Sequence, residues 1–346
     1  WYDGTNDYGA ITFDSGLGAH NKNQFGDKDN IVTDMMFSNY NTGNGALKNS
    51  AAMAKSLGRD PYDYYKGFDI QGRDLSNFYN ADWRNLEGVK ASIGFWGAHS
   101  QGLIHQSATD YGTSDVAIQK AYLEKQELIF SGANRNPANV PAVNGTTTLA
   151  NASLESNFHG VARFNTAKST IQAVPFVSRF NLGNGLTFKN EGEVTFNHKW
   201  HNIATQDYMP TWRWWIENKG NLSASINWEE AYNYGSSIEV SGSLTTGDHL
   251  MRLYKTMIPV TSGGTLRIVY KTTTPGSVEM KLATESSVNP DVTLTDATVT
   301  EKNGWTIADY DLTSLNGKTI YMIALNMKGE TEVPYYELKL GELAVL

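Results

Sequence analysis

Polar and aromatic side chains stand at the ends of four short runs that predict strands. They are Tyr2 with Asp3, Asn39 with Tyr40, Asp69, and Trp96. In a parallel barrel the carboxyl ends of the strands lie along one edge, which lines the active site. Carboxylates and amides there would hydrogen-bond sugar hydroxyls, and rings would pack on the C–H face of a sugar. The carboxylates equally fit a second role, in which they cap the loop or helix that follows.

Other kinds of catalytic and metal site have little support. The sequence has no cysteine, no Gly-x-Ser-x-Gly, no His-Glu-x-x-His and no P-loop. The pair His198 and His201 has no third ligand nearby, so we expect no metal and no cofactor. The acidic residues Glu229, Glu230 and Asp248 carry the oxygen ligands that Ca²⁺ takes, but scattered acids are usually solvated.

Composition limits the class of protein further. The chain has 346 residues, 40% of them hydrophobic and 18% charged, with 32 glycines, as expected of a globular protein with many turns. The net charge of -8 and the lack of a basic cluster argue against nucleic acid as a partner. No apolar run approaches the ~20 residues of a membrane span. The 12% of aromatic residues suits sugar binding, although rings also fill ordinary cores.

The first half of the chain alternates between expected strands and helices. We expect strands over 31–37, 67–71 and 91–96, and helices over 46–57, 75–89 and from 115 to 128. Such alternation predicts a parallel sheet, and no Gly-x-Gly-x-x-Gly opens a helix. A closed (β/α)8 barrel needs ~250 residues, and only about four strands are present. This part therefore predicts the second half of a (β/α)8 TIM barrel, over residues 1–175.

The pattern changes after a stretch rich in Asn, Ala, Thr and Pro, which predicts a long loop over 131–157. Short runs of alternating polarity follow, among them 237–240, 266–270, 278–282 and 320–325. These predict an antiparallel β-sandwich over residues 176–346, with one face of each sheet buried. The stretch Asn190–Glu193 lies between short β runs, and we interpret it as a hairpin turn rather than a catalytic carboxylate pair.

Several stretches, in the same order, resemble family 85 of the glycoside hydrolases, the endo-β-N-acetylglucosaminidases. The resemblance covers residues 1 to about 216. Its most specific motif is the Pro-Thr-Trp-Arg-Trp-Trp run over 210–215. The other matching stretches are Trp1-Tyr2-Asp3, Phe37-Ser38-Asn39-Tyr40, Arg59-Asp60-Pro61-Tyr62-Asp63, the Gly-x-Asp-x-x-Gly-Arg run over 67–73, and the stretch over 175–185. The rest of the chain resembles the galactose-binding-like, carbohydrate-binding-module-like sandwich that commonly follows this catalytic domain.

The resemblance implies an activity and a mechanism. Members of this family cut the GlcNAc-β1,4-GlcNAc bond in the core of N-linked glycans. The 2-acetamido oxygen of the sugar attacks the anomeric carbon and forms an oxazoline intermediate, so the protein supplies no nucleophile. It supplies an acid/base Glu and an amide that orients the acetamide group.

By resemblance, Tyr2 is the catalytic residue of this chain and hydrogen-bonds the acetamide and the oxazoline. Phe13 takes the place of the usual Trp and would stack on sugar. The expected lining of the substrate site is completed by Asp3, Asn39, Tyr40, Asp69 and Trp96. Asn41-Thr42 stands where many members have aromatic residues, which removes one stacking platform.

The family carries its Glu and Asn in an Asn-x-Glu motif on an earlier barrel strand, and no such motif precedes Trp1. We therefore expect a companion N-terminal barrel segment to supply both groups. The expected partners are N-linked glycans of glycoproteins, and the expected location is secreted or on a bacterial cell surface. The alternatives are a lectin-like, non-catalytic glycan-binding protein, and a sandwich that only braces the barrel.

Overall fold

The computed structural model of the chain describes residues 1–69, 83–86, 88–96, 114–131, 169–285 and 289–346. The chain divides into two compact units, Trp1–Ala167 and Lys168–Leu346, which are described separately below. Most of the expected helix over 75–89, the end of the Gly-x-Asp-x-x-Gly-Arg run, and all of the expected long loop over 131–157 except Ser131, which ends a helix, lie outside the described residues.

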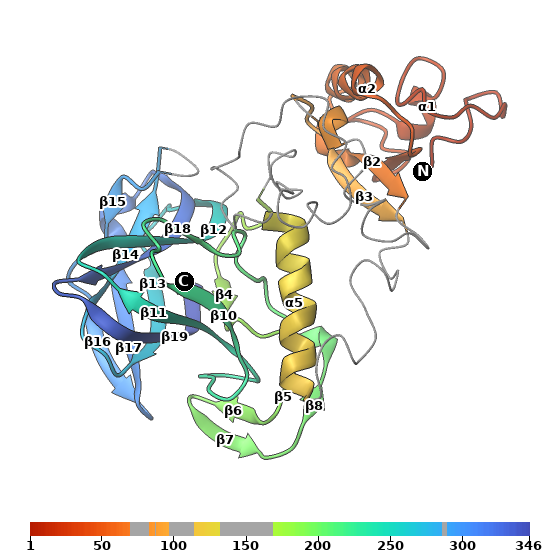
Figure 1. The fold of residues 1–346 in the computed structure, drawn as a ribbon. Coiled ribbons are helices and arrows are strands. Elements are labelled where there is room, and N and C mark those ends of the chain that lie inside the picture. The colour runs from red at the N-terminus through yellow and green to blue at the C-terminus, as the bar shows by residue number, and fades with distance from the viewer. Residues whose placement is uncertain (70–82, 87, 97–113, 132–168, 286–288) are drawn as a thin grey trace. The chain divides into compact units, whose positions relative to one another are not determined.

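The first unit contains a three-stranded parallel sheet whose order follows the chain, β1-β2-β3 (Figure 1). Its strands are β1 (Met36–Ser38), β2 (Tyr64–Asp69) and β3 (Ser92–Trp96). Residues 1–3 run alongside β1, because Phe37 N donates to Trp1 O and Asp3 N donates to Phe37 O. The helices and turns of this unit are α1 (Lys22–Phe25), α2 (Asn44–Ser56), α5 (Asp115–Ser131) and the 3-10 turns η1 (Pro61–Asp63) and η2 (Trp83–Leu86).

The helix α2 connects β1 to β2 in the way a parallel sheet requires. It buries Leu47, Ser50 and Ala54, whose spacing of three and four residues places them on one face of the helix. The helix stops before Gly58, which has a positive φ of 70° and ends the helix as the sequence predicts. The first expected strand is shorter than expected and begins at Met36 rather than at residue 31. Three paired strands do not by themselves show half of an eight-stranded barrel.

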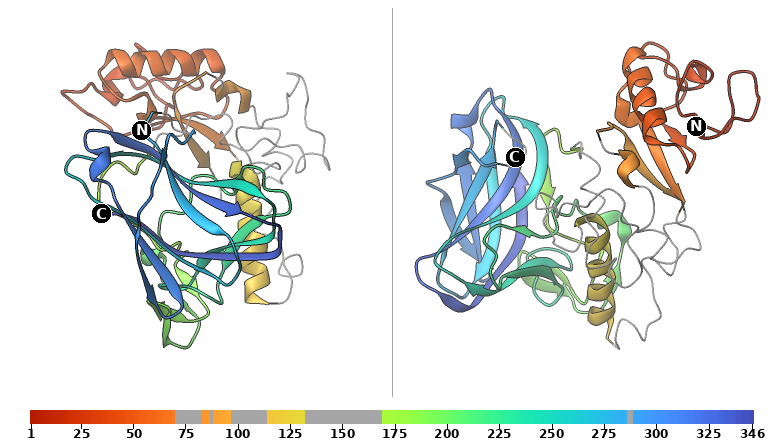
Figure 2. Two further views of the ribbon diagram at one scale, coloured as in Figure 1. Left: turned by 90° about the vertical axis from the view of Figure 1, so that its left-hand side faces the viewer. Right: turned by 45° about the horizontal axis from the view of Figure 1, so that its top comes forward.

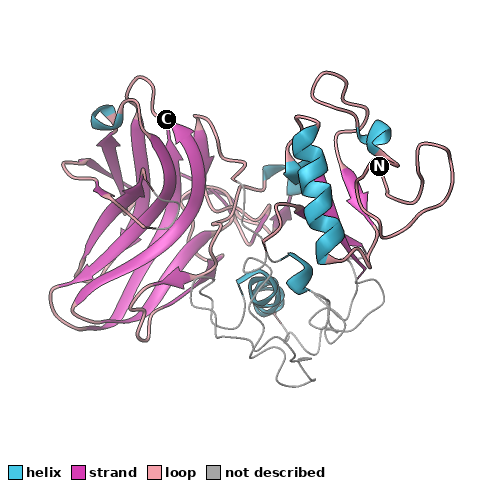
Figure 3. Cartoon of the chain, turned by 90° about the horizontal axis from the view of Figure 1, so that it is seen from above, coloured by secondary structure: helices cyan, strands magenta, loops and turns pink. Residues whose placement is uncertain are grey.

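The second unit consists mainly of two antiparallel sheets, which Figures 1 and 3 show facing each other. The larger sheet has the order β10-β11-β19-β13-β17-β16, and β4 also pairs with β19. The smaller has the order β15-β14-β18-β12-β9. Two short pairs, β5 with β8 and β6 with β7, stand apart from them. The bounds of these strands are β4 (Phe176–Ser178), β5 (Asn184–Gly185), β6 (Phe188–Asn190), β7 (Glu193–Phe196), β8 (Trp200–His201), β9 (Trp215–Ile216), β10 (Ser223–Asn227), β11 (Ser237–Leu244), β12 (Gly247–Pro259), β13 (Thr265–Thr272), β14 (Ser277–Ala283), β15 (Val292–Thr293), β16 (Thr298–Lys302), β17 (Trp305–Asp311), β18 (Thr319–Gly329) and β19 (Val333–Val345), with 3-10 turns η5 (Ile203–Thr205) and η6 (Thr313–Leu315).

The core of the second unit follows from the alternation of apolar residues along these strands. Fully buried side chains come from both sheets, among them Ile268, Met280, Leu282, Leu325 and Leu340. The four runs of alternating polarity noted in the sequence are all strands, and the expected turn at 190–193 joins the antiparallel pair β6 and β7. Figure 2 shows the same sheets in two further views, one from the left-hand side of Figure 1 and one tilted by 45°. Within the described ranges, no helix is both long and apolar enough to cross a bilayer.

Candidate functional site

A chain of side-chain hydrogen bonds lies at the end of the parallel sheet in the first unit. Asp14 Oδ1 accepts a hydrogen bond of 2.6 Å from Asn39 Nδ2. Because the amide nitrogen of Asn39 faces Asp14, its oxygen Oδ1 faces the other way, where it accepts a hydrogen bond from the Tyr2 hydroxyl. The Asp14 carboxylate thus orients the Asn39 amide, and this amide accepts the hydrogen bond that fixes the Tyr2 phenol.

Asp3 supports this series of hydrogen bonds from within the protein, where it is only 2% exposed. Its Oδ1 accepts the backbone N–H of Asn39 at 2.8 Å, which fixes the residue that in turn holds Tyr2. Burial raises the pKa of Asp3 to about 6, although backbone N–H groups of Asn39 and Gly16 and the charge of Lys66 act in the opposite direction. The structure therefore places Asp3 behind the expected site residues rather than on the surface with them.

Three other aromatic rings, those of Phe13, Phe37 and Tyr40, cluster with the ring of Tyr2. The Phe37 ring lies 6.1 Å from that of Tyr2 and 6.3 Å from that of Tyr40, with which it makes an edge contact. Phe13 lies 6.3 Å from Tyr2 on another side and is 53% exposed. Tyr2 is itself 42% exposed, so Tyr2 and Phe13 both offer apolar surface to a ligand. Rings with this degree of exposure can pack on a sugar face.

The ring of Phe37 has room only because two paired strand residues are glycines. Gly67 of β2 lies opposite Gly94 of β3. A Cβ at position 67 would be 2.5 Å from the Phe37 ring, and one at position 94 would be 2.3 Å from it. Either methyl group would displace the ring, since real Cβ atoms do not approach other atoms so closely. The two glycines therefore allow the Phe37 ring of β1 to lie over β2 and β3, and we call this ring the aromatic platform.

Asp69 and Trp96 are paired residues at the ends of β2 and β3. Trp96 is 53% exposed and Asp69 is partly exposed. The charge of Asp69 is a minor contribution to the raised pKa of both Tyr2 and Tyr40. All the predicted site residues except Asp3 thus lie on partly open surface at the same edge of the sheet.

Burial is the main cause that raises the pKa of Tyr2 and of Tyr40 above 10. Both phenols consequently remain protonated at neutral pH and keep their capacity to donate hydrogen bonds. A hydrogen bond between the two hydroxyl groups shifts their pKa values in opposite directions, lowering that of Tyr2 and raising that of Tyr40. The arrangement can bind and orient a polar, partly apolar ligand such as a sugar.

Three residues of this site were missed in the sequence. Asp14 orients Asn39, Phe37 forms the platform, and the buried Lys66 donates from Nζ to the Tyr40 carbonyl oxygen. A weak signal for Asp14 was present, because it directly follows Phe13 in a turn, but its partner lies 25 residues further along the chain. Phe37 begins the family-matching stretch over 37–40, which could have singled it out, whereas nothing local in the sequence marks Lys66.

Two of the three acidic residues considered for Ca²⁺ have other side-chain partners. Glu230 contacts Lys271 and Lys339, and Asp248 accepts a hydrogen bond from Asn326. Within the described part of the chain, no group of three or more His, Asp or Glu side chains is arranged to hold a metal ion.

One family model matches the whole of the first unit and the beginning of the second. The model of glycosyl hydrolase family 85 matches residues 1–188, just over half of the chain. No curated protein matches the chain.

Solved structures give a second comparison. The glycoside hydrolase domain of Endo-D from Streptococcus pneumoniae superposes with a TM-score of 0.70 at 25% identity, over 100% of this chain and 52% of that one. The chain thus spans about half the length of that structure. A β-1,3-glucan binding CBM6 from Bacillus halodurans covers 46% of this chain and 98% of its own at 14% identity. Its TM-score of 0.25 is too low to bear on the fold or function of this protein.

Proposed function

Because the chain belongs to glycosyl hydrolase family 85, we propose that it forms part of an endo-β-N-acetylglucosaminidase acting on N-linked glycans of glycoproteins. The enzyme cleaves the GlcNAc-β1,4-GlcNAc bond of the glycan core by substrate-assisted, retaining hydrolysis through an oxazoline. The observation that carries the proposal is the Tyr2 phenol, held by Asn39 and Asp14 at the open edge of a parallel sheet and surrounded by rings.

In this reaction the acetamide oxygen of the substrate becomes a nucleophile and must be held close to the anomeric carbon. Tyr2 serves as the group that hydrogen-bonds the acetamide and then the oxazoline. Its hydroxyl donates to Asn39 in the free protein. Rotation about the phenolic C–O bond redirects that hydrogen from Asn39 to an acetamide oxygen, while the neighbouring rings of Phe13 and Phe37 keep the Tyr2 ring in place. The raised pKa of Tyr2 keeps the proton available for this donation.

The remaining residues bind and position the substrate. Phe13 packs on a sugar face, and Tyr40, Asp69 and Trp96 line the adjoining edge of the sheet. Asn39 contacts Tyr2 directly, and Asp3 acts one step further away by holding the Asn39 backbone. Asp3 therefore serves as a positioning residue.

The larger architecture is also part of the proposal. Residues 1–175 form the second half of a (β/α)8 barrel, an assignment supported by parallel strands that follow one another in chain order. The acid/base Glu and the amide that orients the acetamide belong to a companion N-terminal barrel segment. Residues 176–346 form a galactose-binding-like sandwich. A glycoprotein substrate of this kind favours a secreted or cell-surface location in a bacterium.

Mass spectrometry of a high-mannose glycoprotein tests the proposal. After incubation with this chain and its companion segment, the glycoprotein should lose its glycan and retain one GlcNAc on Asn. The Tyr2→Phe variant keeps the ring and removes only the hydroxyl, and it should lose at least tenfold in turnover. An unchanged glycoprotein mass, in a preparation that still binds the glycan, would instead favour a lectin-like protein.

A further inference from the structure

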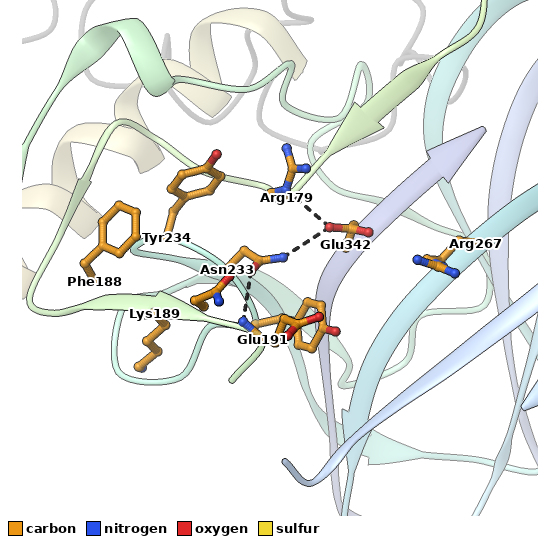
Figure 4. Close-up of a pocket in the computed structure, with 10 residues that line it drawn as sticks. Arg179, Phe188, Lys189, Glu191, Asn233, Tyr234, Arg267 and Glu342 are labelled. Atoms are coloured by element: carbon orange, nitrogen blue, oxygen red, sulfur yellow. Dashed lines mark hydrogen bonds and ion pairs between the residues drawn. The ribbon is translucent and has the colours of Figure 1, made fainter. Parts of the chain in front are cut away.

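A pocket of about 410 Å³ lies within the second unit, far along the chain from Tyr2. It is formed where residues 179–191 and 232–234 pass over the outer face of the larger sheet (Figure 4). Its volume lies in the range of small-ligand sites, which starts near ~300 Å³. The lining residues used below are Arg179, Phe188, Glu191, Asn233, Tyr234 and Glu342, together with Arg267.

The polar side of the pocket centres on Glu342 of β19, which is 8% exposed. Its Oε2 lies 3.3 Å from Arg179 Nε and accepts a hydrogen bond of 3.2 Å from Asn233 Nδ2. Asn233 is fixed in turn, because its Oδ1 accepts the backbone N–H of Glu191 at 3.0 Å. A carboxylate, an amide and a guanidinium are therefore held side by side in fixed orientations, as Figure 4 shows.

The opposite side of the pocket is aromatic. The ring of Tyr234 meets that of Phe188 edge to face at 5.3 Å, and the Arg179 guanidinium lies 5.5 Å from the Tyr234 ring centre. The backbone of Tyr234 is held by a reciprocal pair of hydrogen bonds with Lys189, both of 2.8 Å. Figure 4 shows these two rings on the side away from Glu342 and Arg267. The pocket thus presents a ring beside Arg179 and across from Glu342 and Arg267.

The charged side chains in and around the pocket already have partners, and Lys189, which also lines the pocket, donates to the Glu229 carbonyl oxygen. Arg267 makes two hydrogen bonds of 2.7 Å to Asp309, and Arg179 faces Glu342. Glu191 is paired with Lys302. An anionic ligand would have to approach the carboxylates of both Glu191 and Glu342, so the site does not favour a negative charge. Hydroxyl groups, which both donate and accept, match the mixed donors and acceptors.

We propose that this pocket binds a neutral sugar residue, at a site separate from the Tyr2 site. The carboxylate of Glu342 accepts from one sugar hydroxyl, and Arg179 and Asn233 donate to its neighbours. The ring of Tyr234 packs on the C–H face of the same sugar. The sandwich thereby holds a glycan without taking part in its hydrolysis.

Saturation-transfer NMR on the full chain tests this binding. The probes are the methyl glycosides of mannose, galactose and N-acetylglucosamine, with galacturonic acid as the acidic comparison. We expect at least one neutral probe to bind in the millimolar range. The variants Glu342→Gln and Tyr234→Leu should each weaken binding by about tenfold, since each removes one principal contact.

Two control variants separate this site from the proposed active site. Tyr335→Leu changes a tyrosine of the same unit that is 88% exposed and outside the pocket, and it should leave binding unchanged. Tyr2→Phe should leave binding of the mannose and galactose probes unchanged, because neither carries the acetamide group that Tyr2 is proposed to hold. Thermal unfolding shows whether each variant is folded. If Glu342→Gln does not fold, the binding measured for Tyr234→Leu shows whether the pocket holds the sugar.

The proposal is overturned if no neutral probe binds at tens of millimolar, or if galacturonic acid alone binds. It is equally overturned if the folded Tyr234→Leu variant binds as the unmodified protein does. Loss of binding in Tyr2→Phe alone would assign the sugar to the first unit. Because the probes contain no cleavable core bond, these results do not depend on whether the protein hydrolyses N-glycans.

Discussion

Replacement of Asp14 tests whether the hydrogen-bond chain behind Tyr2 matters for catalysis. Asp14 does not face the substrate in the proposed mechanism, yet it orients the Asn39 amide that holds the Tyr2 phenol. Without Asp14, the Asn39 side chain can turn over and present its nitrogen to Tyr2. The phenol then loses its acceptor and samples other positions, so fewer bound substrates have the acetamide group correctly held.

The structure sets the size of the effect and the choice of variants. The 2.6 Å contact between Asp14 and Asn39 is a charge-assisted hydrogen bond, worth roughly 2 kcal/mol, which corresponds to about 30-fold. Asp14 has a φ of 65°, so an alanine there would add backbone strain unrelated to the lost contact. Asp14→Gly removes the side chain without that strain. Asp14→Asn keeps an acceptor oxygen and should lose only about fivefold.

The assay is hydrolysis of a high-mannose glycopeptide by the chain together with the proposed companion segment, with kcat and KM determined separately. We expect kcat to fall about 30-fold in Asp14→Gly and to recover most of its value in Asp14→Asn, with a smaller change in KM. Far-ultraviolet circular dichroism confirms that each variant is folded. If Asp14→Gly keeps kcat within twofold while Tyr2→Phe loses activity, the hydrogen-bond chain has no role in positioning Tyr2.

Three further predictions concern the stability of each unit. The pKa of Asp3 is about 6 in the folded chain against 3.8 in the unfolded state, so folding favours the protonated form. The free energy of unfolding of the first unit should therefore rise by about 2 kcal/mol as the pH falls from 7 to 4. Urea titrations at several pH values should show this rise, and Asp3→Asn should abolish it. Gly94→Ala places a methyl group against the Phe37 ring and should destabilise the first unit by about 2 kcal/mol, with lower turnover. A variant as stable and active as the parent would show that the position of the Phe37 ring does not depend on the space at Gly94. Tyr254→Phe removes a buried hydroxyl that donates to Tyr208 O, and it should lower the melting temperature of the second unit by about 2–4 °C in calorimetry; no change would mean that this hydrogen bond contributes nothing.

Sequence patterns were informative wherever structure is local. Apolar spacing predicted α2 and the strands of the second unit, and the turn residues between Asn190 and Glu193 predicted a hairpin. Motif resemblance identified the family and singled out Tyr2 and Asn39. These signals depend on residues within one or two turns of the chain, where periodicity and turn chemistry act directly.

Contacts between distant residues were not accessible in this way. Asp14 and Asn39 are 25 residues apart, and the carboxylate of Asp3 became a buried support because β1 passes over it. No periodic pattern records which strand residue will face a given glycine or carboxylate. The strand ends alone could not show that Phe37 occupies the space left by two glycines.

The pocket in the second unit shows most clearly what the sequence determines and what only the tertiary structure decides. The residue types of the protein, its family and most of its strands follow from the amino-acid sequence. The meeting of Asn233 with Glu342, 109 residues apart, depends on how one segment crosses the outer face of a sheet. Sheet pairing and packing, which act between residues remote in the chain, decide such contacts, and only the tertiary structure shows them.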